Sequence, residues 1–252
     1  RNVFYYPAKD IIFYNADIHG NLIVSQRMAV IKRMLEGEPV TVITTIDGLF
    51  DRLLPLEEIA KNRLIFRAED VLPLEALSRE LTAMGFERVS QVESPGQFAV
   101  RGGILDIYNL ADECPYRLEL WGDEIDSIRS FDAESQRSIE QVDKVIIYPA
   151  TEYVMSAAVR DRGLKMIDQD MKRQVKRLKD GQNYETATRL TQVIAELKEN
   201  LEISSASSGI DSLVQYFYGH TVSFLSYFDR DDSLIVLDEP ARAAEKGEAV
   251  TT

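Results

Sequence analysis

The stretch G-Q-F-A-V-R-G-G-I-L-D-I-Y, residues 96–108, decides how the middle of this chain folds. Its apolar residues alternate with others, and this period of two is typical of a half-buried β-strand. A Gly-Gly pair at 102–103 interrupts the alternation directly after Arg101. Because glycine tolerates backbone angles that other residues avoid, the pair predicts a bulge or bend within one strand, Gln97–Tyr108.

A bend of this kind re-aims the neighbouring side chains. Phe98 and Val100 fall on one face of the strand, and we expect them to point into a core. Arg101 falls on the opposite face, toward solvent or toward a partner. The glycine pair matches neither a dinucleotide-binding fingerprint nor the repeated Arg-Gly-Gly segments of RNA-binding proteins, so neither kind of site is indicated.

Strand-like runs continue on both sides of this stretch, joined by short connections. They predict an antiparallel sheet with one helix, so residues 73–150 are interpreted as a small α+β domain. The expected helix is Leu74–Met84, and the expected strands are Arg88–Glu93, Gln97–Tyr108, Tyr116–Trp121, Ile125–Phe131 and Val145–Tyr148.

Residues 1–72 show an alternating order of strands and helices instead. The β-branched run Val40–Thr45 is typical of a buried strand in a parallel sheet, and residues 24–36 carry apolar side chains at helical spacing. This order indicates an α/β domain. The other elements expected here are strands Asn2–Tyr6 and Leu64–Arg67 and a helix at Ile46–Leu54.

Residues 154–202 are predicted to form an antiparallel helical hairpin with a turn at Asp180–Asn183. The first helix carries eight Lys or Arg residues between positions 160 and 179. This charge indicates either a stripe for nucleic acid or a solvated helix face. Four aspartates within or beside the stripe favour the solvated face.

Two more strands are expected, Val222–Phe228 and Leu234–Leu237, before a truncated or frayed C-terminal tail. The second strand, L-I-V-L, is followed by Asp238 and Glu239, and it resembles the strand of P-loop ATPases that ends in a Mg²⁺-binding Asp and a water-positioning Glu. Such a strand needs a phosphate loop, G-x-x-x-x-G-K-[ST], which this sequence does not contain. We therefore interpret the pair as a degenerate Walker-B-like motif, and assign no catalytic residue and no cofactor.

Composition argues against several classes of function. The one cysteine, Cys114, cannot form an internal disulfide, and two distant histidines do not suffice for a Cys/His zinc site. The single cysteine fits a reducing, cytoplasmic location, and no membrane span or signal peptide is visible. The net charge of −13 argues against DNA as the main partner. The chain opens on a strand-like run, which suggests that its natural start lies upstream.

Long strings of this sequence resemble the bacterial transcription-repair coupling factor. The likeness covers nearly the whole chain and is to the N-terminal module of that factor, itself similar to the excision-repair helicase subunit UvrB. The strings are F-E-R-V-S-Q-V-E-S-P-G-Q-F-A-V-R-G-G-I-L-D-I-Y (86–108), P-Y-R-L-E-L-W-G-D-E-I-D-S-I-R-S-F-D-A-E-S-Q-R-S (115–138), Y-P-A-T-E-Y (148–153), V-I-T-T-I-D-G-L-F (42–50) and L-I-V-L-D-E-P-A-R (234–242).

The resemblance implies a layout and a binding surface. Residues 1–72 would begin a degenerate, P-loop-helicase-like α/β domain with a parallel sheet. Residues 73–150 would be an inserted domain that binds the damage-recognition ATPase UvrA, and residues 151–252 would return through the helical hairpin to the first domain. The residues implied at the UvrA surface are Arg88, Arg101, Tyr108, Arg117 and Glu119. Arginine and tyrosine suit this role because they are enriched among residues that dominate interface energies.

The resemblance also implies a function: recruitment of UvrA during nucleotide excision repair, within a factor that removes stalled RNA polymerase from damaged DNA. RNA polymerase and DNA would bind other domains of the parent protein, an ATP-dependent DNA translocase, while this module would be no enzyme. The parent's C-terminal part would mask the UvrA surface.

Two alternatives come from other classes: a UvrB-type ATP-dependent helicase subunit and a purely structural, autoinhibitory insert. Two departures from UvrB favour the coupling factor. Residues 5–17 are too few to hold the aromatic hairpin with which UvrB probes DNA, and Pro240 follows the Asp-Glu pair where UvrB has Ser-His.

Overall fold

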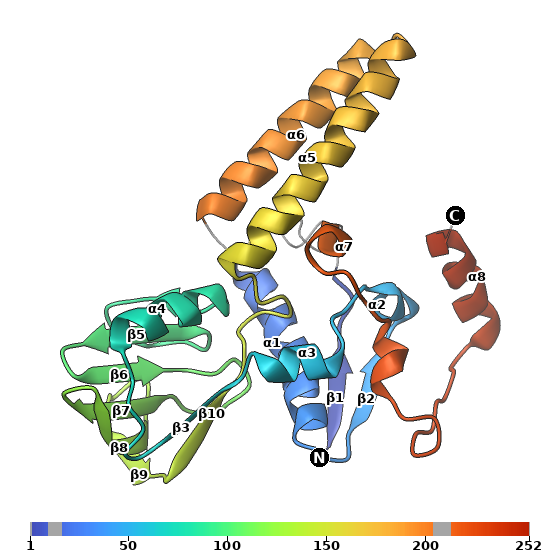
Figure 1. The fold of residues 1–252 in the computed structure, drawn as a ribbon. Helices are drawn as coiled ribbons and strands as arrows, with labels where there is room; N and C mark the ends of the chain where they lie inside the picture. Colours follow the sequence, from blue (N-terminus) through green and yellow to red (C-terminus); the bar gives the residue numbers. More distant parts are fainter. Residues whose placement is uncertain (1, 10–16, 204–212, 252) are drawn as a thin grey trace. The chain divides into compact units, whose positions relative to one another are not determined.

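The computed structural model describes residues 2–9, 17–203 and 213–251. The chain divides into two compact units, Arg1–Val154 together with Val222–Thr252 and, separately, Met155–Thr221. The fold is a mixed α/β fold, with helices and with both antiparallel and parallel pairs of strands (Figure 1).

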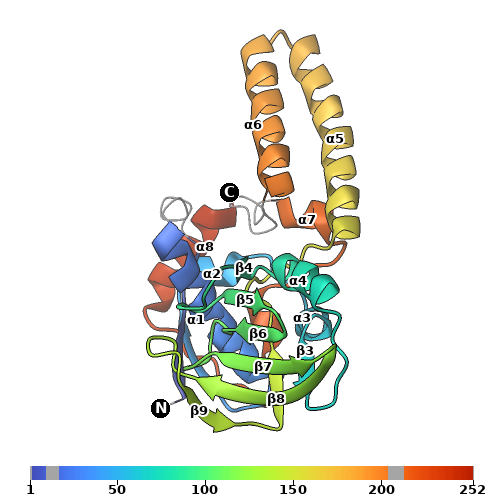
Figure 2. The ribbon, with the colours of Figure 1, turned by 90° about the vertical axis from the view of Figure 1, so that its left-hand side faces the viewer.

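A six-stranded sheet lies in the middle of the sequence, with its strands in the order β4 to β9. Figure 2 shows β5 to β9 side by side across it. Neighbours are antiparallel, except that β4 pairs with β5 in parallel. The predicted antiparallel sheet is thus confirmed. Its strands are β4 (Glu87–Arg88), β5 (Gln97–Arg101), β6 (Ile104–Ile107), β7 (Tyr116–Trp121), β8 (Glu124–Phe131) and β9 (Ser138–Gln141).

The glycine pair is a hairpin turn, so the prediction of one bent strand, Gln97–Tyr108, is wrong. Arg101 at the end of β5 pairs with Ile104 at the start of β6, and the two glycines connect them. Gly102 has a φ of +60°, which is the backbone angle that two-residue hairpin turns demand and that glycine adopts without strain. A bulge and a tight turn both use glycine because it adopts a positive φ without strain. The alternation of apolar residues alone therefore did not distinguish a bent strand from a hairpin.

Two of the other expected strands also differ from the structure. The strand expected at Arg88–Glu93 is reduced to β4, because the chain leaves the sheet after Arg88. The strand expected at Val145–Tyr148 is β10 (Lys144–Ile147), which pairs antiparallel with β3 (Leu64–Arg67) in a separate two-stranded sheet.

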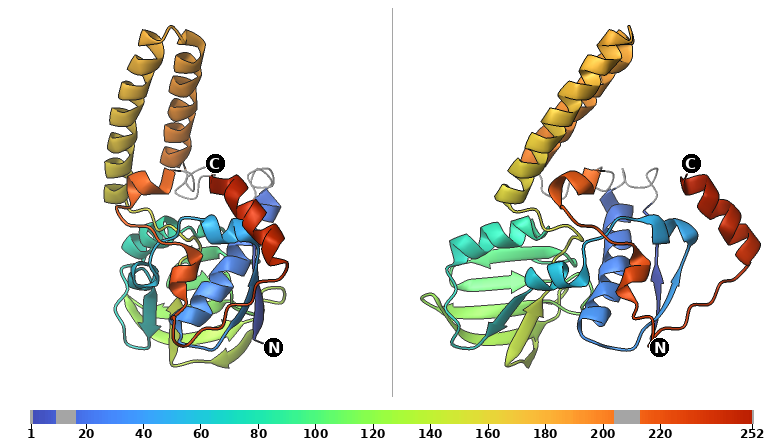
Figure 3. Two further views of the ribbon diagram at one scale, coloured as in Figure 1. Left: turned by 90° about the vertical axis from the view of Figure 1, so that its right-hand side faces the viewer. Right: turned by 45° about the vertical axis from the view of Figure 1, so that its right-hand side comes forward.

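Helix α4 (Leu74–Ala83) packs on one face of the six-stranded sheet (Figure 3, right) and builds the main core. Leu77 and Leu81 of α4 are buried against Phe98, as the sequence predicts for that side chain, and Val100 packs against the same cluster. Each fully buried side chain of this size contributes about 1.5–3 kcal/mol relative to exposure. The opposite face of the sheet is left without a helix, and it carries the site.

The remaining part of the first unit contains a parallel pair of strands, β1 (Val3–Tyr6) and β2 (Thr41–Thr44), with α1 (Asp17–Leu35) between them in sequence. A helicase-like parallel sheet is not confirmed in the described residues. The helix expected at Ile46–Leu54 is shorter, α2 (Ile46–Phe50), and it is followed by α3 (Leu56–Lys61).

Neither of the two expected C-terminal strands forms. Val222 makes one bridge to Leu53, and the chain then turns into a 3₁₀ helix, η2 (Phe224–Tyr227). Phe224 is buried there, with its ring stacked 3.7 Å from the ring of Tyr6, so aromatic packing decides the local backbone.

Leu234–Leu237 has no neighbouring strand among the described residues, and its side chains are 59–89% exposed. A strand without a partner leaves its backbone groups to water, and the apolar composition alone does not hold it in a sheet. The tail is not frayed: helix α8 (Pro240–Thr251) follows, and the ammonium of Lys246 lies 2.5 Å from the carboxylate of Asp47 on α2.

A buried ionic cluster joins α1 to the segment that follows the six-stranded sheet. The Arg27 Nε atom donates to Glu152 Oε1 over 2.8 Å, and its Nη1 atom donates to Asp51 Oδ2 over 2.6 Å. Lys9 Nζ lies 2.5 Å from Glu152 Oε2. Both Arg27 and Glu152 are buried. Burial opposes the ionisation of Glu152, but the charges of Arg27 and Lys9 and their hydrogen bonds outweigh it and hold the pKa of Glu152 at about 2.

The second unit contains the predicted helical hairpin, α5 (Ala157–Asp180) and α6 (Tyr184–Ile203), and a short helix, α7 (Val214–Phe217). Figure 3 (left) shows α5 and α6 side by side. The hydroxyl of Ser156 accepts a hydrogen bond from the Val159 amide and caps α5. Most of the basic side chains of α5 are exposed, and Arg173 lies 2.6 Å from Asp170. Whether this helix binds nucleic acid remains a prediction.

Candidate protein-interaction face

The face of the six-stranded sheet that α4 does not cover carries a row of charged side chains. We call it the open face. Its members alternate with core residues along β5 to β8, and cross-strand pairing sets Asp106 opposite Arg117, Arg117 opposite Arg129, and Glu119 opposite Ser127. The residues of the open face are Arg101, Asp106, Arg117, Glu119, Ser127 and Arg129.

Asp106 is the centre of this face. It is 0% exposed, and both of its oxygens receive charged donors. Arg117 donates to it twice, over 2.7 and 2.9 Å, and Arg101 donates over 2.5 Å. A buried carboxylate of this kind is stable only when it is paired and hydrogen-bonded, and the two arginines provide both.

The guanidinium of Arg117 is held in place by three neighbouring side chains. Its guanidinium lies 4.5 Å from the centre of the Phe131 ring and also donates to the Gln136 side chain. The hydrogen bonds that Arg117 donates to Asp106 raise the pKa of Arg117, so the guanidinium stays charged. Its side chain is only 16% exposed, whereas that of Arg101 is 43% exposed. Arg117 therefore stabilises the face, and the charge of Arg101 is more accessible to a partner.

Glu119 bridges to β8. Its carboxylate accepts a hydrogen bond from the Ser127 hydroxyl over 2.8 Å and lies 3.7 Å from the guanidinium of Arg129. The face thus alternates in sign, with three arginines around two carboxylates.

The structure brings together three of the five residues expected at a protein surface: Arg101, Arg117 and Glu119. Arg88 is not beside them. It pairs with Phe98, which points into the core, and it lines a hollow with Val100 and residues of α4, on the other side of the sheet. Tyr108 is not an exposed aromatic side chain, because it is 9% exposed and its hydroxyl donates to the Glu113 carbonyl.

Sequence reasoning missed Asp106 and Arg129. Both follow the alternation of their strands, but the pairing of β6 with β7 and of β7 with β8 is what places them beside Arg117. Asp106 alone gave a signal, an acidic residue inside an apolar strand, which calls for a buried cationic partner.

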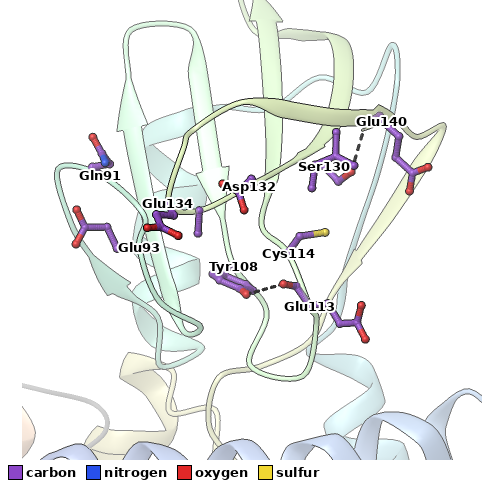
Figure 4. A pocket seen from close by; sticks show the side chains of 11 residues that line it. Gln91, Glu93, Tyr108, Glu113, Cys114, Ser130, Asp132, Glu134 and Glu140 are labelled. Carbon is purple, nitrogen blue, oxygen red and sulfur yellow. Dashed lines mark hydrogen bonds between the residues drawn. The ribbon is translucent and has the colours of Figure 1, made fainter.

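A hollow of about 690 Å³ lies at one end of the same domain (Figure 4). Tyr108 and Cys114 line it together with five carboxylates: Glu93, Glu113, Asp132, Glu134 and Glu140. Burial raises the pKa of the Cys114 thiol, which keeps it protonated and unreactive at neutral pH. The hollow therefore offers no activated nucleophile.

The Asp238–Glu239 pair does not end a strand, in contrast to the expected motif. Glu239 has a φ of +48° and lies 3.1 Å from Arg242 at the start of α8. Among the described residues, no group of three or more His, Cys, Asp or Glu side chains is placed to hold a metal ion. None of the helices in the described ranges is long and apolar enough to cross a lipid bilayer.

Comparison with known proteins identifies the domain that carries the open face. A family model described as the UvrB interaction domain matches residues 64–153, from β3 to just beyond Glu152. Residues 64–153 match the UvrB interaction domain family.

The wider chain resembles two kinds of repair protein. The transcription-repair-coupling factor of Bacillus subtilis (strain 168) is 32% identical over 248 residues, which cover 98% of this chain and 21% of that protein. The coupling factor of Staphylococcus aureus (strain USA300) is 27% identical, over 100% of this chain and 21% of that protein. UvrABC system protein B of Thermosipho africanus (strain TCF52B) is 30% identical over 241 residues, which cover 93% of this chain and 36% of that protein.

The resemblance expected from the sequence is therefore confirmed. The chain spans about a fifth of the length of its coupling-factor relatives. The region that matches the UvrB interaction domain lies within the part of the chain that these relatives cover, and its open face is the candidate site.

Proposed function

We propose that this chain is the protein-interaction module of a transcription-coupled DNA repair factor and that it recruits UvrA in nucleotide excision repair. The observation that carries the proposal is the Arg101–Asp106–Arg117 arrangement on the open face of a UvrB interaction domain. A sheet face that has no helix over it, carries partly exposed arginines and is held rigid by a buried carboxylate is suited to bind a protein surface without reorganising.

The proposal is tested by calorimetric titration of the chain with purified UvrA. Arg101→Ala should weaken binding by about 1–4 kcal/mol, the range of interface hot spots. The melting temperature should fall by only a few degrees, because Arg117 still donates to the buried Asp106 carboxylate after Arg101 is removed. Arg189→Ala on the exposed side of α6 is the matched control and should bind like the parent chain. No binding of UvrA by the parent chain would refute the proposal.

Arg88 and Tyr108 have different places in this proposal. Arg88 can contact UvrA only if the partner reaches round the β4 edge to the α4 side, so loss of binding in Arg88→Ala would show a larger footprint. Tyr108 supports the loop at Glu113 from inside. Its replacement should lower stability as well as binding.

The rest of the proposed role belongs to the parent protein. RNA polymerase and DNA would bind its other domains, its translocase motor would lie outside this chain, and its C-terminal part would cover the open face until repair begins. The parallel pair β1–β2 would be what this chain holds of a degenerate helicase-like domain. The location would be cytoplasmic.

The similarity to UvrABC system protein B favours one second candidate, an ATP-dependent helicase subunit. The sequence lacks a phosphate loop, so we propose that the chain neither binds nor hydrolyses ATP. Titration with Mg-ATP distinguishes the two candidates, because micromolar binding would support the helicase subunit.

A further inference from the structure

The single tryptophan of the sequence, Trp121, is 86% exposed. It is the last residue of β7, and alternation along β7 puts it on the same face as Arg117 and Glu119, opposite the core residue Leu118. A tryptophan in this position leaves most of its large apolar surface in water, so it adds little hydrophobic stabilisation to the fold. Residues of this type are enriched where binding energy is concentrated.

Trp121 lies at the same end of the sheet as Arg101. The β5–β6 turn at Gly102–Gly103 and the β7–β8 turn after Trp121 both close antiparallel hairpins at that end. The amide of Leu120 donates to the Gly103 carbonyl over 2.7 Å, so the two turns are hydrogen-bonded neighbours. The indole therefore extends the open face toward Arg101.

Arg129 is the second unassigned residue of this face. Its side chain is 41% exposed, and its one described ion pair, with Glu119, is long at 3.7 Å. Arg117, directly opposite, already gives its donors to Asp106 and Gln136. The charge that a partner can reach thus comes from Arg101 and Arg129, at two places on the face.

We propose that Trp121 and Arg129 are binding residues of the open face and that the UvrA surface it accepts is acidic, with an apolar recess for the indole. This inference rests on the proposed function and adds the chemistry of the partner. The domain around the face is acidic, with seven Lys or Arg against fifteen Asp or Glu in residues 74–150. Carboxylates of a partner are therefore attracted only to the exposed arginines and are repelled elsewhere, which fixes the docking position.

The neighbours of Trp121 refine this chemistry. Glu124 lies directly opposite it on β8, and Asp123 is in the turn between them. A carboxylate of the partner beside the indole would be repelled. The recess must therefore be uncharged or basic at its margin, while the carboxylates face Arg101 and Arg129.

The test measures the affinity of purified UvrA for four variants of the whole chain by calorimetry: Trp121→Ala, Trp121→Phe, Arg129→Glu and Arg101→Ala. Trp121→Ala and Arg129→Glu should each weaken binding about 10- to 30-fold. Trp121→Phe keeps an aromatic ring and should lose less. Tyr184→Ala and Arg189→Glu on α6 are exposed, match the substitutions in chemistry, and should bind like the parent chain.

Salt dependence provides a second readout. The affinity of the parent chain should fall as NaCl rises, and the fall should be shallower for Arg129→Glu because one attractive charge is gone. Melting temperatures of all variants should stay within a few degrees of the parent.

The outcomes separate this inference from the function on which it rests. Loss of binding in Arg101→Ala, with Trp121→Ala and Arg129→Glu unaffected, overturns the inference and leaves the proposed function standing. If Trp121→Ala weakens UvrA binding and Arg129→Glu does not, the proposal that the bound UvrA surface is acidic is overturned. No binding of UvrA by the parent chain overturns both.

Discussion

Glu152 is a buried carboxylate whose charge is matched by Arg27 and Lys9. Removing one partner of a buried ion pair leaves the other charge uncompensated and costs about 3–5 kcal/mol. Glu152→Gln should therefore lower the free energy of unfolding at neutral pH by about that amount. The pKa is about 2 in the folded protein against an ordinary 4.5, so this stabilisation is present above pH 4.5 and is lost as the pH falls toward 2.

Urea unfolding at several pH values checks this prediction. The difference in stability between the parent protein and Glu152→Gln should be full at neutral pH and shrink as the solution is acidified below about pH 4.5. The double variant Arg27→Met/Glu152→Leu removes both charges and should recover most of the loss. A single variant as stable as the parent at neutral pH would contradict the assignment.

Asp106 holds two arginines in place without reaching solvent itself. We expect Asp106→Asn to reduce stability by about 1–3 kcal/mol, because a charged acceptor is replaced by a weaker one. UvrA binding should also weaken, since Arg101 and Arg117 lose their fixed positions. A thermal melt and a titration measure the two effects. Asp126→Asn, on an exposed carboxylate of β8, should change neither, and equal effects in both variants would show that Asp106 has no special role.

At the scale of residues, the sequence predicted which side of its own strand a residue lies on better than which residues of other strands lie beside it. Alternation correctly placed Phe98 in the core and Arg101 opposite it. It did not reveal that Arg88 lies on the other side of the sheet, because that depends on the parallel pairing of β4 with β5. Tyr108 could not be assigned to the interior from its own strand either, since the loops that cover it come from elsewhere in the sequence.

At the scale of elements, two glycines within helices should respond in opposite ways to the same substitution. A Cβ on Gly163 of α5 would lie 2.1 Å from the Phe217 ring of α7, so Gly163→Ala should cost about 1–3 kcal/mol by overpacking. A Cβ on Gly247 of α8 would meet Phe50 at an ordinary 3.7 Å, so Gly247→Ala should stabilise by up to about 1 kcal/mol through helix propensity.

Chemical denaturation of both variants measures this pair. Phe217→Leu combined with Gly163→Ala makes room for the added methyl group and should recover part of the loss. Stabilisation by Gly163→Ala alone would mean that α7 does not pack on α5 as described.

The run Leu234–Leu237 consists of apolar residues whose side chains are all exposed to solvent. Exposed apolar runs of high β-propensity promote association. Leu234→Lys with Val236→Lys should reduce self-association at high protein concentration, measured by sedimentation velocity, and leave the melting temperature unchanged. A clear fall in melting temperature would show that the run is packed in solution. Ser233→Lys, just before the run, controls for the added charge.

The elements that the sequence predicted well are those whose stability is local. The α5–α6 hairpin and α4 follow from helical spacing and from turn residues. In the large sheet, β7 and β8 follow from alternation and short turns. The elements predicted wrongly, at Val222–Phe228 and Leu234–Leu237, are those whose state depends on a distant partner: Tyr6 captures Phe224 by stacking, and nothing among the described residues pairs with Leu234–Leu237.

At the scale of the whole molecule, the net charge of −13 opposes contact with a polyanion. We expect little retardation of duplex DNA by this chain in a gel-shift assay at near-physiological salt. A salt-sensitive shift that charge reversal at Lys172 and Lys176 abolishes would instead identify the exposed side of α5 as a nucleic-acid site. Charge reversal at Arg79 on α4 is the control.

The pairing of β3 with β10 has a consequence for how this architecture can be inherited and reused. Leu64, where the UvrB interaction domain begins, lies directly across from Ile147, near its end, at a spacing of about 5 Å. A domain whose entry and exit points are neighbours can be spliced into a surface loop of another protein with little added loop entropy. The same geometry would let residues 64–147 be removed and the gap closed by a few residues, and the binding face that we propose would move with them as one unit.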